Sequence, residues 1–460
     1  MKTETIAAIA TALSDAGISI IRISGDEAIN VADRIFVTKE KNHILKNVKS
    51  HTIHYGFLFD GDELIDEVMV SVMKAPKSYT TEDTVEINCH GGILMSRKVL
   101  SLVLQNGARL AEPGEFTKRA FLNGRIDLSG AEAVMDIIHS ENEMFLKSSV
   151  KQLRGSLSSS IRTLREKILF EIAFIESAID DPEHISLDGY QDRLSEIVDD
   201  ISVSLQKLID SFDTGKLMRE GIRTVILGKP NAGKSSFLNL LVGEEKAIVT
   251  DVAGTTRDAL EEYVKVRGVS LKVIDTAGIR STDDVVEKIG VEKAIRFADD
   301  ADLILYVVDS SRTLDENDHR ICEMIRDKRA IILYNKTDLH AAVTEDEIFD
   351  LIGKRFPLIH VSAIENIGLD EFEKLVKEMF FEGKISSSDE IFITNIRHKE
   401  AISEALEALK LVKKSLADQM PEDFYSIDLM HAYTSLGFVI GEEVGEDLVN
   451  EIFSKFCMGK

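Results

Sequence analysis

The sequence predicts a multidomain α/β chain. We expect an N-terminal α+β domain, a discontinuous α-helical bundle, and a P-loop domain with a doubly wound sheet inserted into that bundle. Three observations support this. A phosphate-loop motif lies between a strand-like and a helix-like run near residue 228, apolar residues at helical spacing flank that segment on both sides, and residues 1–119 alternate short apolar runs with turn signals. The expected boundaries are 1–119, 120–215, 216–381 and 382–460, with the second and fourth segments forming one bundle.

The length and net charge of the chain limit the number of domains and the classes of function that we expect. The chain has 460 residues, of which 44% are apolar, enough for roughly three domains of about 150 residues with their own cores. Acidic residues outnumber basic ones, 80 to 55, and the net charge is −25. This excess argues against a broad nucleic-acid-binding surface, because phosphate contacts need a basic patch. If the substrate is a nucleic acid, we expect a basic partner to hold most of it.

Cysteine usage and hydropathy indicate the compartment. Cys89, Cys322 and Cys457 are far apart and odd in number, which fits neither a disulfide framework nor a zinc cluster and suits a reducing cytoplasm. No apolar run approaches the roughly 18–20 residues of a membrane span. The first residues faintly resemble a signal peptide, but Glu4 and the alanine-rich stretch favour a first strand. We therefore expect a cytoplasmic protein without a membrane segment.

The N-terminal segment has strand-like runs at residues 18–23 and 67–72 and helix-like runs at 26–36 and 94–105. Three polar residues there lie beside glycines or in turn-like stretches: Arg22, Glu82 and His90. Taken alone, each fits surface or turn chemistry better than a site. Cys89 next to His90 could suggest a metal, but no second ligand pair has suitable spacing.

The bundle segments are marked by apolar stripes at spacings of three and four, which we interpret as bundle packing on long helices. The first stripe predicts one long helix and consists of Leu153, Leu157, Ile161, Leu164, Ile168, Ile172, Ile175 and Ile179. The second consists of Tyr190, Leu194, Ile197, Ile201, Leu205, Leu208 and Phe212. A third, of Ile402, Leu406, Leu409, Val412 and Leu416, ends before Pro421, and further helices are expected at 426–440 and 446–456.

The phosphate-loop motif reads G-x-x-x-x-G-K-S from Gly228 to Ser235 and follows a strand-like run. Its glycines allow backbone N–H groups to face phosphate oxygens at a helix N-terminus. Lys234 would reach the β- and γ-phosphates, and the Ser235 hydroxyl would ligate Mg²⁺. Loop residues expected at the nucleotide are Asn231, Ala232, Gly233, Lys234, Ser235 and Ser236.

Four further motifs follow in the order that a GTP-binding domain needs, at or near strand ends. Thr256 would be a second Mg²⁺ ligand. Asp338 would accept the N1–H and the exocyclic amine of guanine, and adenine lacks that donor pair. These motifs predict GTP rather than ATP. They add as nucleotide-binding residues Thr250, Thr255, Thr256, Asp275, Thr276, Ala277, Gly278, Asn335, Lys336, Asp338, Ser362 and Ala363.

Two positions bear on hydrolysis. Ile279 stands where Ras-type proteins have a water-orienting Gln, so another residue must do that work. Glu287 is our candidate, although from the residues alone a solvated charge on an expected helix at 285–296 is the favoured interpretation. Asn231 could ligate a monovalent cation beside the phosphates or simply cap the turn.

The chain ends Phe456-Cys457-Met458-Gly459-Lys460. With residues 115–124 and 254–258, this ending closely resembles the tRNA-modification GTPase family called MnmE or TrmE, over the whole chain. Met458 replaces the usual Ile, a mild change. The resemblance implies a tetrahydrofolate derivative, 5,10-methylene or 5-formyl, bound by Arg22, Glu82, Arg119 and Lys460. It also implies potassium ligands at Asn231, Thr250, Val252 and Thr255, and Glu287 as catalytic residue.

The function implied by this resemblance is modification of C5 of the wobble uridine, position 34, of certain tRNAs. The protein would act as a homodimer and with an FAD-containing partner of the MnmG or GidA type, adding an aminomethyl or carboxymethylaminomethyl group. Cys457 would be a nucleophile or, as we favour, a supporting thiol. The alternative is a ribosome-assembly or stress switch GTPase, which should carry a basic RNA-binding module. A FeoB-type transporter would need membrane helices.

Overall fold

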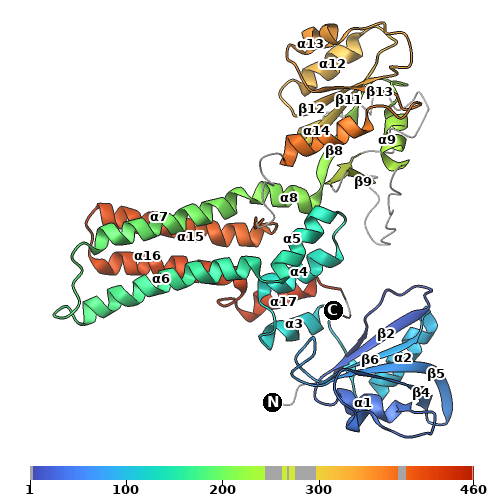
Figure 1. The fold of residues 1–460 in the computed structure, drawn as a ribbon, viewed down its shortest axis with the longest axis vertical. Coiled ribbons are helices and arrows are strands. Elements are labelled where there is room, and N and C mark those ends of the chain that lie inside the picture. The colour runs from blue at the N-terminus through green and yellow to red at the C-terminus, as the bar shows by residue number, and fades with distance from the viewer. Residues whose placement is uncertain are drawn as a thin grey trace. The chain divides into compact units, whose positions relative to one another are not determined.

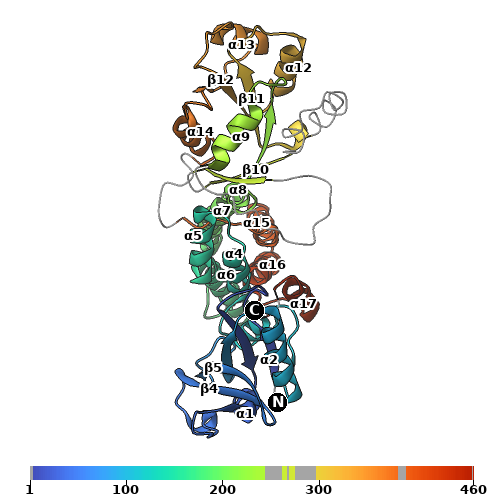
Figure 2. The ribbon, with the colours of Figure 1, turned by 90° about the vertical axis from the view of Figure 1, so that its right-hand side faces the viewer.

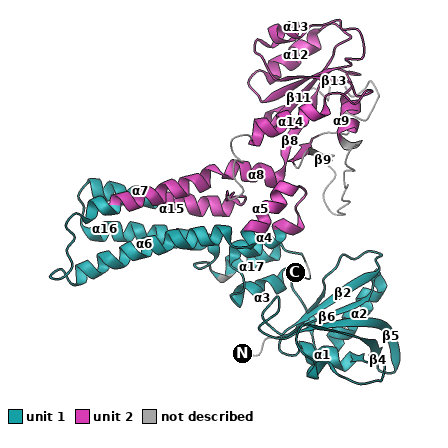
Figure 3. Ribbon diagram, in the orientation of Figure 1, with its two compact units in different colours: residues 1–135, 152–194, 407–460 teal, residues 136–151, 195–406 magenta. Residues whose placement is uncertain are grey.

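The computed structural model describes residues 4–243, 262–266, 269–274, 297–381, 390–457 and 459, and it divides into two compact units (Figure 3). Unit 1 comprises residues 1–135, 152–194 and 407–460, and unit 2 comprises residues 136–151 and 195–406. Each unit therefore contains segments far apart in sequence. Among the described residues, no helix is both long and apolar enough to span a bilayer.

Unit 1 contains a seven-stranded sheet of order β3-β4-β5-β6-β2-β1-β7, antiparallel except for the β1–β7 pair. Helices α1 (Ala28–Ile35) and α2 (Ile93–Gln105) pack their apolar sides on one face of it (Figure 1). The strands predicted at 18–23 and 67–72 and both helices are confirmed, within a few residues. The strands are β1 (Ile6–Ile9), β2 (Ile18–Ser24), β3 (Phe36–Val37), β4 (Thr52–Asp60), β5 (Glu63–Met73), β6 (Thr84–His90) and β7 (Arg109–Leu110).

The opposite face of this sheet carries exposed apolar side chains. Ile53, Tyr55 and Met69 are 65%, 53% and 45% exposed. Tyr55 lies directly opposite Met69 in the β4–β5 register. Since side chains alternate between faces along a strand, one face supplies the core and the other stays open within this unit.

The helices of unit 1 include α3 (Glu115–Leu122), α6 (Ser156–Asp180), α16 (Glu422–Ile440) and α17 (Glu446–Ser454), with α6 packed along α16. The prediction of one helix through Leu153 to Ile179 was wrong. Helix α5 (Glu143–Leu153) ends and α6 begins anew, because Gly155 adopts a left-handed φ of 89° between them. Both ends of the predicted stripe are exposed, whereas its middle is buried.

Unit 2 contains a six-stranded sheet of order β13-β12-β11-β8-β10-β9, parallel except for the β9–β10 pair. Its strands are β8 (Ile222–Leu227), β9 (Glu262–Val266), β10 (Val269–Val273), β11 (Leu303–Asp309), β12 (Ala330–Asn335) and β13 (Leu358–Val361). Helices α9 (Lys234–Gly243) and α14 (Leu369–Phe381) cover one face, and α12 (Glu316–Ile325) and α13 (Glu345–Ile352) the other (Figure 2). This confirms the predicted doubly wound P-loop domain.

The remaining helices are α4 (Leu128–Ile138), α7 (Tyr190–Asp210), α8 (Phe212–Glu220) and α15 (Ile396–Ala417). The second predicted stripe runs along α7, except that Phe212 belongs to α8. Within α7 the core position is Val198, which is fully buried, whereas the predicted Ile197 is only partly buried. The boundaries expected after residues 119 and 215 fall inside α3 and α8, so the domain bounds stay predictions.

Candidate functional site

The phosphate loop connects β8 to α9 at the carboxyl end of the parallel sheet. Three of its residues have positive φ angles: Gly228 at 151°, Asn231 at 61° and Gly233 at 99°. A Cβ on Gly233 would lie 2.0 Å from Nδ2 of Asn335, so only glycine fits there. Such a backbone turns successive N–H groups toward one point, which is the geometry that binds phosphate.

Lys234 and the two serines after it occupy the first turn of α9. The Lys234 ammonium donates hydrogen bonds of 2.8 Å to the carbonyl oxygens of Gly228 and Lys229. Burial lowers its pKa. A partly buried cation held by carbonyl dipoles suits an anionic ligand. Ser235 is half-buried and Ser236 is exposed.

The base-recognition segments lie at the ends of the next strands. Asn335 ends β12, and its Nδ2 donates a 2.8 Å hydrogen bond to the carbonyl of Ala232. Its Oδ1 is buried without a hydrogen-bond partner among the described residues, as expected for a group that faces a ligand. Ser362, after β13, donates from Oγ to Oδ1 of the exposed Asp338 at 2.8 Å. Ala363 follows directly, so the structure brings the predicted guanine-binding residues together.

Lys336 has a left-handed φ of 64° and lies 2.6 Å from the buried carboxylate of Asp309, at the end of β11. Burial alone would raise the pKa of Asp309, but hydrogen bonds from Lys336 and Ser311 outweigh this and lower it. Asp309 therefore holds the Lys336 side chain at the edge of the base-recognition segments.

Ten predicted site residues lie outside the described residues. These are Thr250, Val252, Thr255, Thr256, Asp275, Thr276, Ala277, Gly278, Glu287 and Lys460. The catalytic assignment and most of the magnesium and potassium assignments depend on them, so those assignments stay predictions. Of the ion ligands, Asn231 and Ser235 are described.

A second polar cluster lies in unit 1, where Glu82 accepts hydrogen bonds from Arg119 at 2.9 and 3.2 Å and from Ser24 at 2.8 Å. Arg119 also pairs with Glu115 at 2.9 Å, and Glu115 binds Arg109 at 2.6 Å. Burial alone would raise the pKa of Glu115, but hydrogen bonds from Arg109 and Arg119 lower it to about 2. The predicted Glu82 and Arg119 thus form a nearly buried ion pair.

Arg22 lies beside the C-terminal tail. Its Nε donates to Glu86 at 2.8 Å, and a terminal nitrogen donates to the carbonyl of Gly459 at 3.2 Å. Its guanidinium lies 5.7 Å from the ring centroid of Tyr79 and 5.6 Å from that of Phe116. The structure therefore brings Arg22 to the residue next to the predicted Lys460. Cys457 is an exposed free thiol in the same tail.

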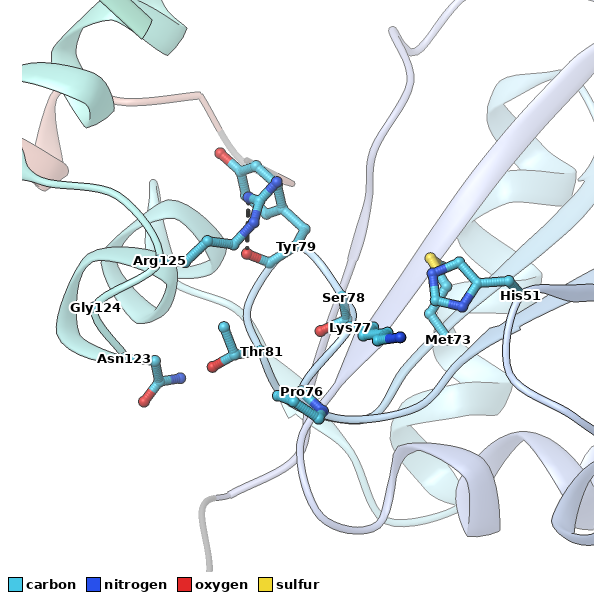
Figure 4. A pocket seen from close by; sticks show the side chains of 10 residues that line it. All are labelled: His51, Met73, Pro76, Lys77, Ser78, Tyr79, Thr81, Asn123, Gly124 and Arg125. Atoms are coloured by element: carbon cyan, nitrogen blue, oxygen red, sulfur yellow. Dashed lines mark hydrogen bonds between the residues drawn. The ribbon is translucent and has the colours of Figure 1, made fainter. Parts of the chain in front are cut away.

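A cavity of about 550 Å³ opens at Tyr79 (Figure 4). Arg125 lies 4.8 Å from the Tyr79 ring centroid and donates to the Tyr79 carbonyl at 3.1 Å. Lys77 and Asn123 also line the cavity. Lys77, Tyr79 and Arg125 were not predicted from the sequence. Arg125 could have been found, because it directly follows the signature at 115–124.

Comparison with known proteins gives the family. Residues 5–125 match the family model described as the GTP-binding protein TrmE N-terminus, and residues 128–457 match the MnmE helical domain. The tRNA modification GTPase MnmE of Lachnoclostridium phytofermentans is 57% identical over 460 residues, covering 100% of both chains. The chain belongs to the MnmE family of tRNA-modification GTPases.

A second relative supports the same family assignment. The MnmE of Alkaliphilus oremlandii is 48% identical over 464 residues, covering 99% of each chain. The solved G domain of the T. maritima FeoB iron transporter is 24% identical and covers 34% of this chain and 97% of that one, but its TM-score of 0.26 is too low to bear on function. In this MnmE-family chain, Arg22 and the Glu82–Arg119 ion pair lie in the first matched range, and the phosphate loop lies in the second. His90 pairs with Asp66, and the described residues contain no cluster of three or more His, Cys, Asp or Glu side chains that could hold a metal ion.

Proposed function

We propose that this protein is a potassium-stimulated GTPase that modifies C5 of the wobble uridine, position 34, of certain tRNAs. It adds an aminomethyl or carboxymethylaminomethyl group together with an FAD-dependent partner of the MnmG type. The observation that carries the proposal is the 57% identity to a tRNA modification GTPase over the full length of both chains. The reducing cytoplasm is its proposed location, supported by three free cysteines.

The nucleotide is GTP. Asp338 presents a carboxylate to the two N–H donors of guanine, and Ser362 holds that carboxylate at 2.8 Å. Lys234 neutralises the phosphates. Ser235 and Thr256 ligate Mg²⁺, which supplies charge neutralisation when bound. Asn231 fits a potassium ligand because its amide is exposed on a loop whose left-handed φ asparagine tolerates. Thr250, Val252 and Thr255 complete the proposed potassium set, and Glu287 orients the attacking water.

The proposed folate site consists of Arg22, Glu82, Arg119 and Lys460, and the folate would supply the one-carbon unit. Glu82 keeps lone pairs for the N–H groups of a pterin, while Arg119 acts through Glu82 by holding its carboxylate in place at 2.9 Å. The cations Lys77 and Arg125 in the neighbouring cavity suit the carboxylates of a folate tail.

The proposed assembly is a homodimer with the FAD-dependent partner bound in addition. The open sheet face of Ile53, Tyr55 and Met69 supports pairing of two copies, because exposed apolar side chains gather there. The net charge of −25 supports a division of labour in which the partner holds most of the tRNA.

The proposal is tested by mass spectrometry of nucleosides from total tRNA of a strain lacking this protein. We expect loss of C5-aminomethyl-type uridines and their return when the intact gene is restored. Unchanged nucleosides in a strain without a duplicate gene would refute the modification function. A ribosome-assembly switch would then be the leading interpretation, and ribosome profiles of the same strain would test it.

A further inference from the structure

Lys229, the second residue of the phosphate loop, is fixed by three hydrogen bonds. Its Nζ lies 2.7 Å from the carboxylate of Asp318, 3.1 Å from that of Asp315, and 3.1 Å from the carbonyl of Thr313. The three donors of the ammonium group are thus all used. Burial alone would lower the Lys229 pKa, but the hydrogen bonds that its ammonium donates to Asp318 and Asp315 raise it.

Asp318 is itself held on both carboxylate oxygens. It is 1% exposed, and its Oδ1 accepts a 2.8 Å hydrogen bond from the hydroxyl of Tyr306. Its Oδ2 accepts one of 2.9 Å from the backbone N–H of Asp315, in the capping box that begins α12. Tyr306 is fully buried in the middle of β11. A carboxylate held on both oxygens is a rigid anchor, and removing its cation would leave a buried charge uncompensated.

Lys229 also contributes to the loop through its backbone. Its carbonyl accepts one of the two recorded hydrogen bonds from Lys234, at 2.8 Å. Gly228, Asn231 and Gly233 in the same loop all have positive φ. Such backbone conformations are sparsely populated and persist only where surrounding contacts hold them. The Lys229 side chain therefore fixes the segment whose carbonyls hold Lys234.

We propose that Lys229, anchored by Asp318 and Tyr306, is a positioning residue that preorganises the phosphate loop for the phosphates of the bound nucleotide. It acts through its backbone carbonyl, which holds Lys234. The inference rests on the proposed function in one respect, that the loop binds GTP and GDP. Because preorganisation removes the cost of ordering the loop on binding, its loss should weaken phosphate binding and spare base recognition.

The test compares inhibition constants of GDP and of guanosine, which lacks phosphate, by competition against a fluorescent GDP analogue on the full chain. In Lys229→Met, we expect GDP to bind about tenfold more weakly, the loss typical of one hydrogen bond to a charged group. The guanosine constant should stay within about twofold, because base contacts are kept. Lys229→Arg should restore most of the GDP affinity. Lys374→Met, an exposed lysine on α14, is the charge-matched control.

GDP affinity unchanged in Lys229→Met, or GDP and guanosine weakened equally, would overturn the inference. If Lys229→Met fails to fold, Tyr306→Phe decides: a loss of about two- to threefold in GDP affinity with guanosine unchanged is expected, and wild-type GDP affinity overturns the inference. Failure of the wild-type chain to bind GDP would instead refute the nucleotide assignment itself, so the two failures are distinguishable.

Discussion

Asn335 joins the two halves of the nucleotide site, because its Nδ2 donates a 2.8 Å hydrogen bond to the carbonyl of Ala232 in the phosphate loop. The amide passes so close that a Cβ on Gly233 would lie 2.0 Å from it. This hydrogen bond therefore fits together two segments of the predicted nucleotide site whose contacting residues are 103 positions apart in sequence.

Replacing Gly233 by Ala should abolish this fit. Both the collision with Asn335 and the φ of 99° oppose a side chain, so we expect GDP affinity to fall at least about 100-fold. Isothermal titration calorimetry measures the GDP affinity. Gly189→Ala is the matched control, because Gly189 also has a positive φ, 72°, with no atom within 4 Å of its would-be Cβ. Equal affinity in Gly233→Ala and wild type would contradict the fitted geometry.

Replacing Asp338 by Asn should change base specificity. The amide keeps the size of the side chain but replaces one acceptor with a donor, which matches the carbonyl that xanthine has in place of the guanine amine. We expect GDP affinity to fall about 100-fold or more and xanthosine diphosphate to bind better than GDP. Competition titrations with both nucleotides decide this. Continued preference for GDP would remove Asp338 from base recognition.

Replacing Asn231 by Gly should remove potassium stimulation. Glycine keeps the left-handed φ of 61° and deletes only the amide, so a change in rate reports on the ligand and not on backbone strain. We expect hydrolysis in potassium to slow about 100-fold, toward the rate in sodium, with GDP affinity nearly unchanged. Wild-type protein that hydrolyses GTP equally fast in both salts would exclude a potassium site.

Replacing Glu287 by Ala should separate binding from turnover. If its carboxylate orients the attacking water, GTP affinity should stay near normal while turnover falls by about 10²- to 10⁴-fold. Single-turnover phosphate release measures the chemical step. Glu287→Gln tests whether the charge itself is required. Turnover at the wild-type rate in the Ala variant would assign the role to another residue.

The buried Glu115 should make unit 1 sensitive to acid. Its pKa is lowered to about 2 in the folded state against an ordinary value of 4.5, so the stability it contributes is complete above pH 4.5 and is lost as the pH falls toward 2. Glu115→Gln should lower the unfolding free energy of unit 1 by about 2–3 kcal/mol at pH 7, a deficit that shrinks with acidity. Hydrogen exchange of α3 at pH 7 and 3.5 measures the loss of unfolding free energy and its decrease with acidity.

The matched control for this experiment is Glu63→Gln, because Glu63 is 66% exposed and its pair with Lys98 should matter little at either pH. A deficit for Glu115→Gln that stays constant from pH 7 to pH 3.5 would contradict the assigned ionisation.

The helical spacing of the bundle residues shows how far sequence periodicity reaches. Leu157 to Ile175 are buried along α6 as the pattern predicts, because a 3.6-residue period follows from backbone geometry alone. The break at Gly155 was missed, since a glycine inside an apolar stripe is compatible with a helix until neighbouring elements force its φ to 89°.

By itself the sequence determined the nucleotide chemistry and the order of the parts. A strand, a Gly-rich turn and a helix dictate a phosphate loop through short-range backbone sterics, and a carboxylate after β12 predicts guanine as the base. Only the tertiary structure decided which distant side chains meet: Arg119 with Glu82, Arg125 with Tyr79, Lys229 with Asp318. Those side-chain contacts depend on sheet order and helix packing over long sequence separations, and no local sequence pattern encodes them.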